Sequence, residues 1–248
     1  MSDQMINLKF TKEQNQAIVD AILKGSDFYL EERRVKKNEM LVSAGYAWAK
    51  SNHIENALGS ELKPLGIVYE EKRISSWEYL QFSIPENKVS FLVKSPSFIK
   101  SFQEDTKKNK QHYIRDYARC NDALIKSDDF QAYVVDKQLE LPIEETLTLF
   151  EVKNEDIDRG YLVVYDTDVS GMIKEIKTFL PNSNGQMYEV DDLTPFIEKS
   201  TYEFRSDTLD IAEDTFTDAQ SMSTDAGFDF KVTGKVKSDD TDIKKKSV

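Results

Sequence analysis

The sequence predicts an α+β protein, and three features of the chain support this expectation. A capping sequence, Thr-Lys-Glu-Gln at 11–14, precedes apolar residues at helical spacing in residues 12–24. Several runs of alternating polar and apolar residues are separated by short polar turns, the pattern of antiparallel strands. Residues 206–229 contain seven Asp or Glu and no Lys or Arg, a composition unlike the rest of the chain.

These features divide the chain into four expected regions. Residues 1–94 are expected to combine helices with a small antiparallel sheet, in the order of a winged helix. Residues 95–126 are expected to form one long basic helix, and residues 127–205 a second antiparallel sheet. Residues 206–248 are expected to be an acidic, disordered tail, because so few apolar side chains do not offset the entropy lost on ordering.

The composition limits which kinds of protein this chain can be. Hydrophobic residues make up 39% of the 248 residues, with 14 Phe and 11 Tyr, which is enough to build a sizeable core. The single cysteine, Cys120, has no partner for a disulfide within the chain, which fits a cytoplasmic protein. The N-terminal residues lack a signal-peptide pattern, and no window is apolar enough for a membrane span, so no membrane partner is expected.

Charge is distributed unevenly along the chain. The formal net charge is −12, yet residues 88–126 hold nine Lys or Arg against four Asp or Glu. Residues 127–248 hold 13 basic and 28 acidic residues. Such asymmetry indicates either an electrostatic partner or neutralisation of one part of the chain by the other.

The N-terminal region has the element order of a winged helix. The first helix is expected to end at Gly25, a second helix to be capped by Asn52 and to end at Gly59, and strands to follow at 65–72 and 77–84. In a DNA-binding interpretation, Lys50, Asn52 and His53 begin a recognition helix and Arg73 lies at the tip of the wing.

The alternative to DNA binding is a purely structural role for this region. Trp48, Ile54 and Leu58 are then core residues, and the polar residues between them are a helix cap and its neighbours. Acidic residues also crowd the expected binding face and would repel phosphates. They are Glu55, Glu61, Glu70 and Glu71.

The long basic helix is the best candidate for a nucleic-acid or protein contact. After a strand at 89–93, Ser95 and Pro96 are suited to the start of a helix, and no Gly or Pro interrupts the chain up to residue 126. Four basic side chains are expected near one face, namely Lys108, His112, Arg115 and Arg119. The alternative is a solvated face, or one that contacts the acidic half of the same chain.

The clearest hairpin lies at residues 159–181, between expected strands at 131–135 and 146–152 and another at 187–190. It contains Asp166 followed by Glu175-Ile176-Lys177, an arrangement used by metal-dependent nucleases. In such enzymes the two carboxylates hold Mg²⁺ and the lysine orients or polarises the attacking water. The alternative is an ordinary hairpin whose charged residues pair across a solvated face.

The sequence therefore supports three hypotheses. The first is a non-enzymatic interaction or regulatory protein without a cofactor, acting on a protein or nucleic-acid partner through the basic helix or the acidic tail. A bacterial or phage source is inferred from the Lys- and Asn-containing composition. The second is a metal-dependent nuclease using Asp166, Glu175 and Lys177, and the third is a winged-helix DNA-binding protein.

Overall fold

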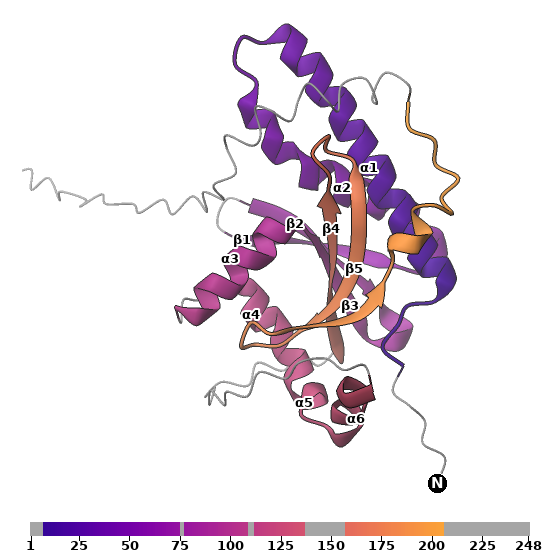
Figure 1. Ribbon diagram of the computed structural model, residues 1–248, viewed down its shortest axis with the longest axis vertical. Coiled ribbons are helices and arrows are strands. Elements are labelled where there is room, and N and C mark those ends of the chain that lie inside the picture. Colours follow the sequence, from indigo (N-terminus) through magenta and orange to yellow (C-terminus); the bar gives the residue numbers. More distant parts are fainter. Residues whose placement is uncertain (1–6, 75–76, 109–111, 137–156, 206–248) are drawn as a thin grey trace, which may run out of the picture.

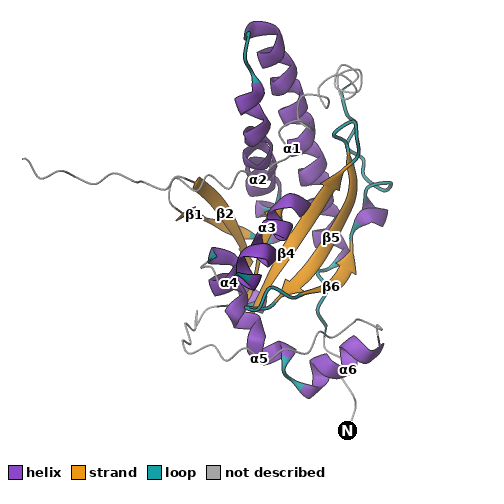
Figure 2. Cartoon of the chain, turned by 60° about the vertical axis from the view of Figure 1, so that its left-hand side comes forward, coloured by secondary structure: helices purple, strands orange, loops and turns teal. Residues whose placement is uncertain are grey.

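The computed structural model describes residues 7–74, 77–108, 112–136 and 157–205. These residues form a mixed α+β fold in which helices pack on a largely antiparallel sheet (Figures 1 and 2). Two expectations, the strand at 146–152 and the disordered tail at 206–248, lie outside the described residues. No described helix combines the length and the apolar composition needed to cross a membrane.

One six-stranded sheet is present instead of the two separate sheets that the sequence suggested. The strands lie side by side in chain order, and all neighbours are antiparallel except the central pair, β3 and β4, which are parallel. The strands expected at 65–72, 77–84, 89–93 and 187–190 and the hairpin at 159–181 are confirmed within a few residues at their ends. The strands are β1 (Val68–Ile74), β2 (Trp77–Ile84), β3 (Val89–Lys94), β4 (Arg159–Thr167), β5 (Ile173–Pro181) and β6 (Met187–Asp192).

Helix α1 (Lys12–Glu39) begins at the expected capping box. The Thr11 side chain accepts a hydrogen bond from the Gln14 N–H, and the Gln14 side chain accepts one from the Thr11 N–H. The expected end at Gly25 is wrong, because α1 continues to Glu39. Gly25 lies against helix α2 (Lys50–Glu61), where a Cβ atom would lie 2.5 Å from the Cα of Ile54. The glycine permits close helix packing and does not terminate the helix.

Helix α2 also differs from the expected boundaries. It begins two residues before Asn52 and extends beyond Gly59. The 3₁₀ turn η1 (Ala44–Ala49) leads directly into it, and Ala49 already has right-handed helical dihedral angles, so no capping side chain is used. A Cβ atom on Gly59 would lie 3.2 Å from the ring of Tyr69 on β1, which indicates that this glycine also serves packing.

The single long basic helix is not confirmed, because the described chain forms several short helices there. Helix α3 (Pro96–Lys107) begins as expected after Ser95. The next helix, α4 (Tyr113–Ala118), has its own N-cap: His112 has an extended backbone, and its Nδ1 accepts a hydrogen bond from the Ile114 N–H at 3.2 Å. A further 3₁₀ turn, η4 (Arg119–Asn121), and α5 (Asp122–Ile125) follow.

The strand expected at 131–135 is wrong, because these residues lie in helix α6 (Asp128–Asp136). Asp128 and Asp129 occupy its first turn, where acidic side chains interact favourably with the helix dipole. The Ser127 hydroxyl accepts a hydrogen bond from the Phe130 N–H. Phe130 packs edge-on against Tyr188 of β6, with ring centroids 5.2 Å apart. A short apolar run fits a strand or a helix equally well, and these contacts select the helix.

The two faces of the sheet are covered by different helices. Helices α1 and α2 lie side by side against one face and extend beyond the edge of the sheet (Figure 2). Ile22 of α1 and Tyr161 of β4 belong to the large buried cluster on that face. Leu162, the next residue of β4, packs with Phe102 of α3 and Ile114 of α4 in a second cluster on the opposite face. The central strands are therefore buried on both sides.

We predict that Gly25→Ala destabilises the protein although alanine favours helices. The added methyl group would collide with the backbone of α2, which cannot rotate away, and forcing the two helices apart should cost about 1–3 kcal/mol. Gly45→Ala is the matched control, because a Cβ atom there has no neighbour within 4 Å. Urea unfolding of both variants measures the difference, and an unchanged stability of Gly25→Ala would contradict the close approach.

Candidate functional site

The most distinctive surface feature is an apolar groove where α1 connects to α2. The groove has a volume of about 360 Å³. The rings of Trp48 and Trp77 lie 6.1 Å apart at a tilt of 42°. Several large apolar side chains there are exposed to solvent: Met40 by 44%, Val42 by 78%, Trp48 by 37% and Trp77 by 50%. The groove is lined by Met40, Val42, Ser43, Gly45, Tyr46, Trp48, Ala49, Asn52 and Trp77.

Three segments position the groove. Helix α1 ends where Met40 becomes extended, and the buried Arg33 of α1 donates a hydrogen bond to the Ser43 carbonyl, which fixes the connection to η1. The turn η1 carries Trp48, and Trp77 is the first residue of β2. The groove thus lies between the end of α1, the start of α2 and the hairpin formed by β1 and β2.

Lys50 is the first residue of α2 and directly follows Ala49, which lines the groove. Its ammonium group donates a hydrogen bond to the Gly171 carbonyl at 3.1 Å and lies 5.8 Å and 5.9 Å from the ring centroids of Tyr29 and Tyr165. Burial lowers the pKa of Lys50 to about 8, although Asp168 and Asp166 act in the opposite direction. The amine is therefore held inside the protein by aromatic faces and one carbonyl.

A buried ion pair lies one helical turn further along α2. Pairing between β2 and β3 extends only to Phe82 and Phe91, so the sheet opens as a fork beyond them. Glu55 enters this fork: its carboxylate accepts a hydrogen bond from the Leu80 N–H at 2.8 Å and lies 3.3 Å from the Lys94 ammonium. Burial raises the pKa of Glu55, and the Lys94 charge opposes this shift. Because the two strands are not paired beyond this point, the first residues of β2, including Trp77, can lie near η1 and away from β3.

The expected carboxylate pair of the hairpin is brought together. Asp166 and Glu175 are direct partners in the β4–β5 register, and alternation places Lys177 on the same face as Glu175. Asp166 is 2.8 Å from Lys174, and the Lys177 ammonium is 2.9 Å from Glu175. Within the described ranges, no group of three or more His, Cys, Asp and Glu side chains is arranged to hold a metal ion.

The four basic residues expected on one helix face are distributed over three elements. Lys108 is the C-cap of α3 and lies 3.9 Å from Glu104, whereas Arg115 is in α4. Arg119, at the start of η4, lies 3.3 Å from Asp116. His112 lies among aromatic rings, including that of Phe102 at 5.2 Å, and burial lowers its pKa, so its imidazole is neutral at pH 7.

The residues of the DNA-binding interpretation have other contacts. Lys50 donates a hydrogen bond to the Gly171 carbonyl, and Asn52 lines the groove. His53 Nε2 is 2.8 Å from a carboxylate oxygen of Glu32 in α1. Arg73 is near the end of β1, opposite Glu78 in the register with β2.

A second hollow, of about 430 Å³, lies at the opposite end of the sheet. It is lined by Asn7, Leu124, Asp158 and Arg159. The guanidinium of Arg159 donates a hydrogen bond to the Asn7 carbonyl at 2.7 Å, so its charge already holds the N-terminal segment in place. This hollow is larger, but none of its lining residues is an aromatic side chain, and the groove is the stronger candidate for binding.

Comparisons with models of protein families, with curated protein sequences and with solved structures found no match for this chain.

Sequence reasoning did not identify the groove. Trp48 was interpreted as a core side chain, and Trp77 only as the start of a strand. One signal was present in the sequence: the apolar run Met40-Leu41-Val42 directly follows a charged helical segment and precedes Gly45. Such a run at a helix end is a candidate for exposure, but only the tertiary structure places Trp77 beside it.

We predict that Lys50 makes stability depend on pH between about 8 and 10. Its pKa is about 8 in the folded protein, against an ordinary value of 10.5, so the unfolded chain binds more protons in this range. The free energy of unfolding should therefore rise with pH there. In Lys50→Met this rise should be smaller, and Lys100→Met, at an exposed position on α3, is the control. Urea unfolding at several pH values tests this; equal slopes in wild type and Lys50→Met would contradict it.

Proposed function

We propose that the protein is a non-enzymatic, cytoplasmic interaction protein that binds an apolar segment of a protein partner in the groove between η1 and β2. The observation that carries this proposal is the exposure of Trp48 and Trp77 side by side over a groove of about 360 Å³. Tryptophan is among the residues that contribute most to binding energy at protein interfaces. Clustered apolar exposure of this kind is characteristic of interaction surfaces.

The size and lining of the groove indicate the kind of partner. Two indole rings and the side chains of Met40 and Val42 offer a mainly apolar surface, with the Asn52 amide and the Ser43 hydroxyl as polar groups at its edge. A groove of this volume accommodates one or two side chains rather than a folded domain. The expected ligand is therefore a short segment with a large aliphatic or aromatic anchor.

Buried polar contacts hold the segments that lead into the groove, which favours binding. Arg33 fixes the connection after α1, and the Glu55–Lys94 pair fixes the fork from which β2 emerges. The entropic cost of binding would therefore come from ordering the partner segment and not from ordering the groove.

We predict that peptides selected from a displayed random library on the full chain will bind through the groove. Val42→Asp should abolish their binding, because it places a charge against the apolar ligand. Val169→Asp is the matched control: Val169 is also exposed, by 76%, but lies in the turn between β4 and β5. Titration calorimetry measures both affinities, and peptides that bind the two variants equally well would refute the groove as the binding site.

The nuclease hypothesis is favoured by one observation, the direct cross-strand pairing of Asp166 with Glu175. Both carboxylates have lysine neighbours, so a divalent cation would have to compete with Lys174 and Lys177.

The nuclease hypothesis predicts cleavage of DNA or RNA in the presence of Mg²⁺ or Mn²⁺, with loss of cleavage in Glu175→Gln. Removal of one carboxylate charge would weaken the cation site. Glu198→Gln, at an exposed position after η5 (Thr194–Phe196), should leave the result unchanged. Gel electrophoresis of the nucleic acid measures the outcome, and wild type and Glu175→Gln giving the same product pattern would exclude catalysis by this pair.

A further inference from the structure

We infer that residues 207–216 of the same chain lie along the end of α1, place Ile211 and Phe216 in the groove and compete with its partner. This inference rests on the proposed function of the groove. It assigns a regulatory role to the acidic segment that follows the last described residue.

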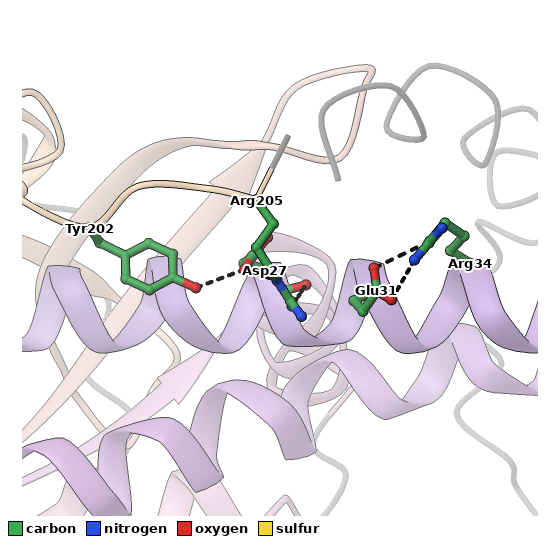
Figure 3. Close-up of polar contacts among 5 residues, drawn as sticks. All are labelled: Asp27, Glu31, Arg34, Tyr202 and Arg205. Carbon is green, nitrogen blue, oxygen red and sulfur yellow. Dashed lines mark hydrogen bonds and ion pairs between the residues drawn. The ribbon is translucent and has the colours of Figure 1, made fainter. Parts of the chain in front are cut away.

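The described chain leads toward the groove along α1. Residues 196–205, here called the strap, contact successive turns of α1: the Phe196 carbonyl accepts a hydrogen bond from Gln16, and the Arg205 side chain binds Asp27. The strap therefore runs parallel to α1, toward the helix end that borders the groove. Figure 3 shows the same direction, with Tyr202 and then Arg205 placed along the helix before Arg34.

The end of the strap is firmly attached to α1. Asp27 is fully buried, and its carboxylate accepts hydrogen bonds from the Tyr202 hydroxyl at 2.7 Å and from Arg205 Nε at 2.8 Å (Figure 3). A second guanidinium nitrogen of Arg205 donates to the Asp27 carbonyl at 3.1 Å, and the guanidinium carbon lies 5.2 Å from the ring centroid of Phe28. The following residues thus start from a fixed point on the helix.

The distance from this point to the groove is short. Met40, at the edge of the groove, is 13 residues beyond Asp27 in the sequence. At about 1.5 Å per helical residue the separation along α1 is roughly 20 Å. About six extended residues span this length. Residues from about 211 onward therefore reach the groove without any change in the described structure.

The chemistry of the segment matches its route. Residues 206–216 read SDTLDIAEDTF, with four acidic residues, with Leu209 along the route and with Ile211 and Phe216 as apolar anchors for the groove. The stretch of α1 along the route, residues 28–39, reads FYLEERRVKKNE and holds four basic and three acidic residues. Arg34 already pairs with Glu31, and Lys36 pairs with Glu39. Acidic side chains would pass the four basic residues of this stretch, and Ile211 and Phe216 would reach the two tryptophans. The charge attraction is modest at the surface and weakens with salt.

An occupant tethered in this way regulates the groove by competition. A segment tethered this close to its site has an effective concentration in the millimolar range, so even weak docking fills the groove for part of the time. A partner protein then has to displace the segment. The apparent affinity of the partner is reduced in proportion to the fraction of molecules in which the groove is already occupied.

The two tryptophans provide a direct readout. They are the only tryptophans in the sequence, and both line the groove, so intrinsic fluorescence reports on this site alone. The test compares the full chain with a Leu209→Ser, Ile211→Ser, Phe216→Ser variant. Emission should shift to longer wavelength and quenching by acrylamide should increase in the variant. The control is Phe228→Ser, Phe230→Ser, which changes apolar residues later in the same region and should match wild type.

A second measurement uses a synthetic peptide of residues 206–216. Added to the triple variant, it should reverse the spectral shift, and it should have no effect when Val42→Asp is also present. Emission that is identical in wild type and in the triple variant, or a peptide without effect, overturns the inference. A wild-type spectrum that changes on dilution also overturns it, because a second copy of the chain would then be the occupant.

Failure of this inference is distinguishable from failure of the proposed function. Library peptides that require Val42 but bind wild type and the triple variant equally well support the groove as a binding site and overturn its occupation by residues 207–216. Tighter binding to the triple variant supports both. Peptides that are indifferent to Val42→Asp refute the proposed function, whatever the tryptophan spectra show.

Discussion

The parallel pairing of β3 with β4 is the constraint on which the rest of the fold depends. It joins two antiparallel groups of strands, and parallel neighbours require a long crossover, which here contains α3 to α6. Asn121 holds the beginning of this junction. Its fully buried amide donates to the carbonyls of Gly160 and Pro181 and accepts from the Gly160 N–H. One side chain thus satisfies three backbone groups where β4 begins and β5 ends.

Helix α1 connects the core to the groove because it is longer than the sheet it covers. Its first half is buried through Ile18 and Ile22, and its second half extends beyond the sheet beside α2 (Figure 2). Gly25 brings α2 close at the transition between these halves. The exposed groove forms where the end of α1 and the turn η1 meet the first residue of β2, and the apolar residues Met40 and Val42 remain exposed there.

Two ion pairs with a buried carboxylate connect segments of this protein that are far apart in the chain. Glu55 and Lys94 hold the fork between β2 and β3, and Asp27 and Arg205 hold the strap on α1. An unpaired charge in such positions would be strongly destabilising, whereas each of these carboxylates has a cation and an additional hydrogen-bond donor. The contact between Asp27 and Arg205 also sets the starting point of the segment proposed to occupy the groove.

The sequence alone determined the local structure of this protein. The capping box at Thr11 and the hairpin containing Asp166 and Glu175 depend on neighbours within a few residues, and both were predicted. Only the tertiary structure decided that Gly25 serves helix packing, that residues 131–135 are helical and that Trp48 lies beside Trp77. These outcomes depend on contacts between residues far apart in the chain. Capping and alternation act through nearby backbone groups, whereas helix packing and groove formation depend on which distant surfaces meet.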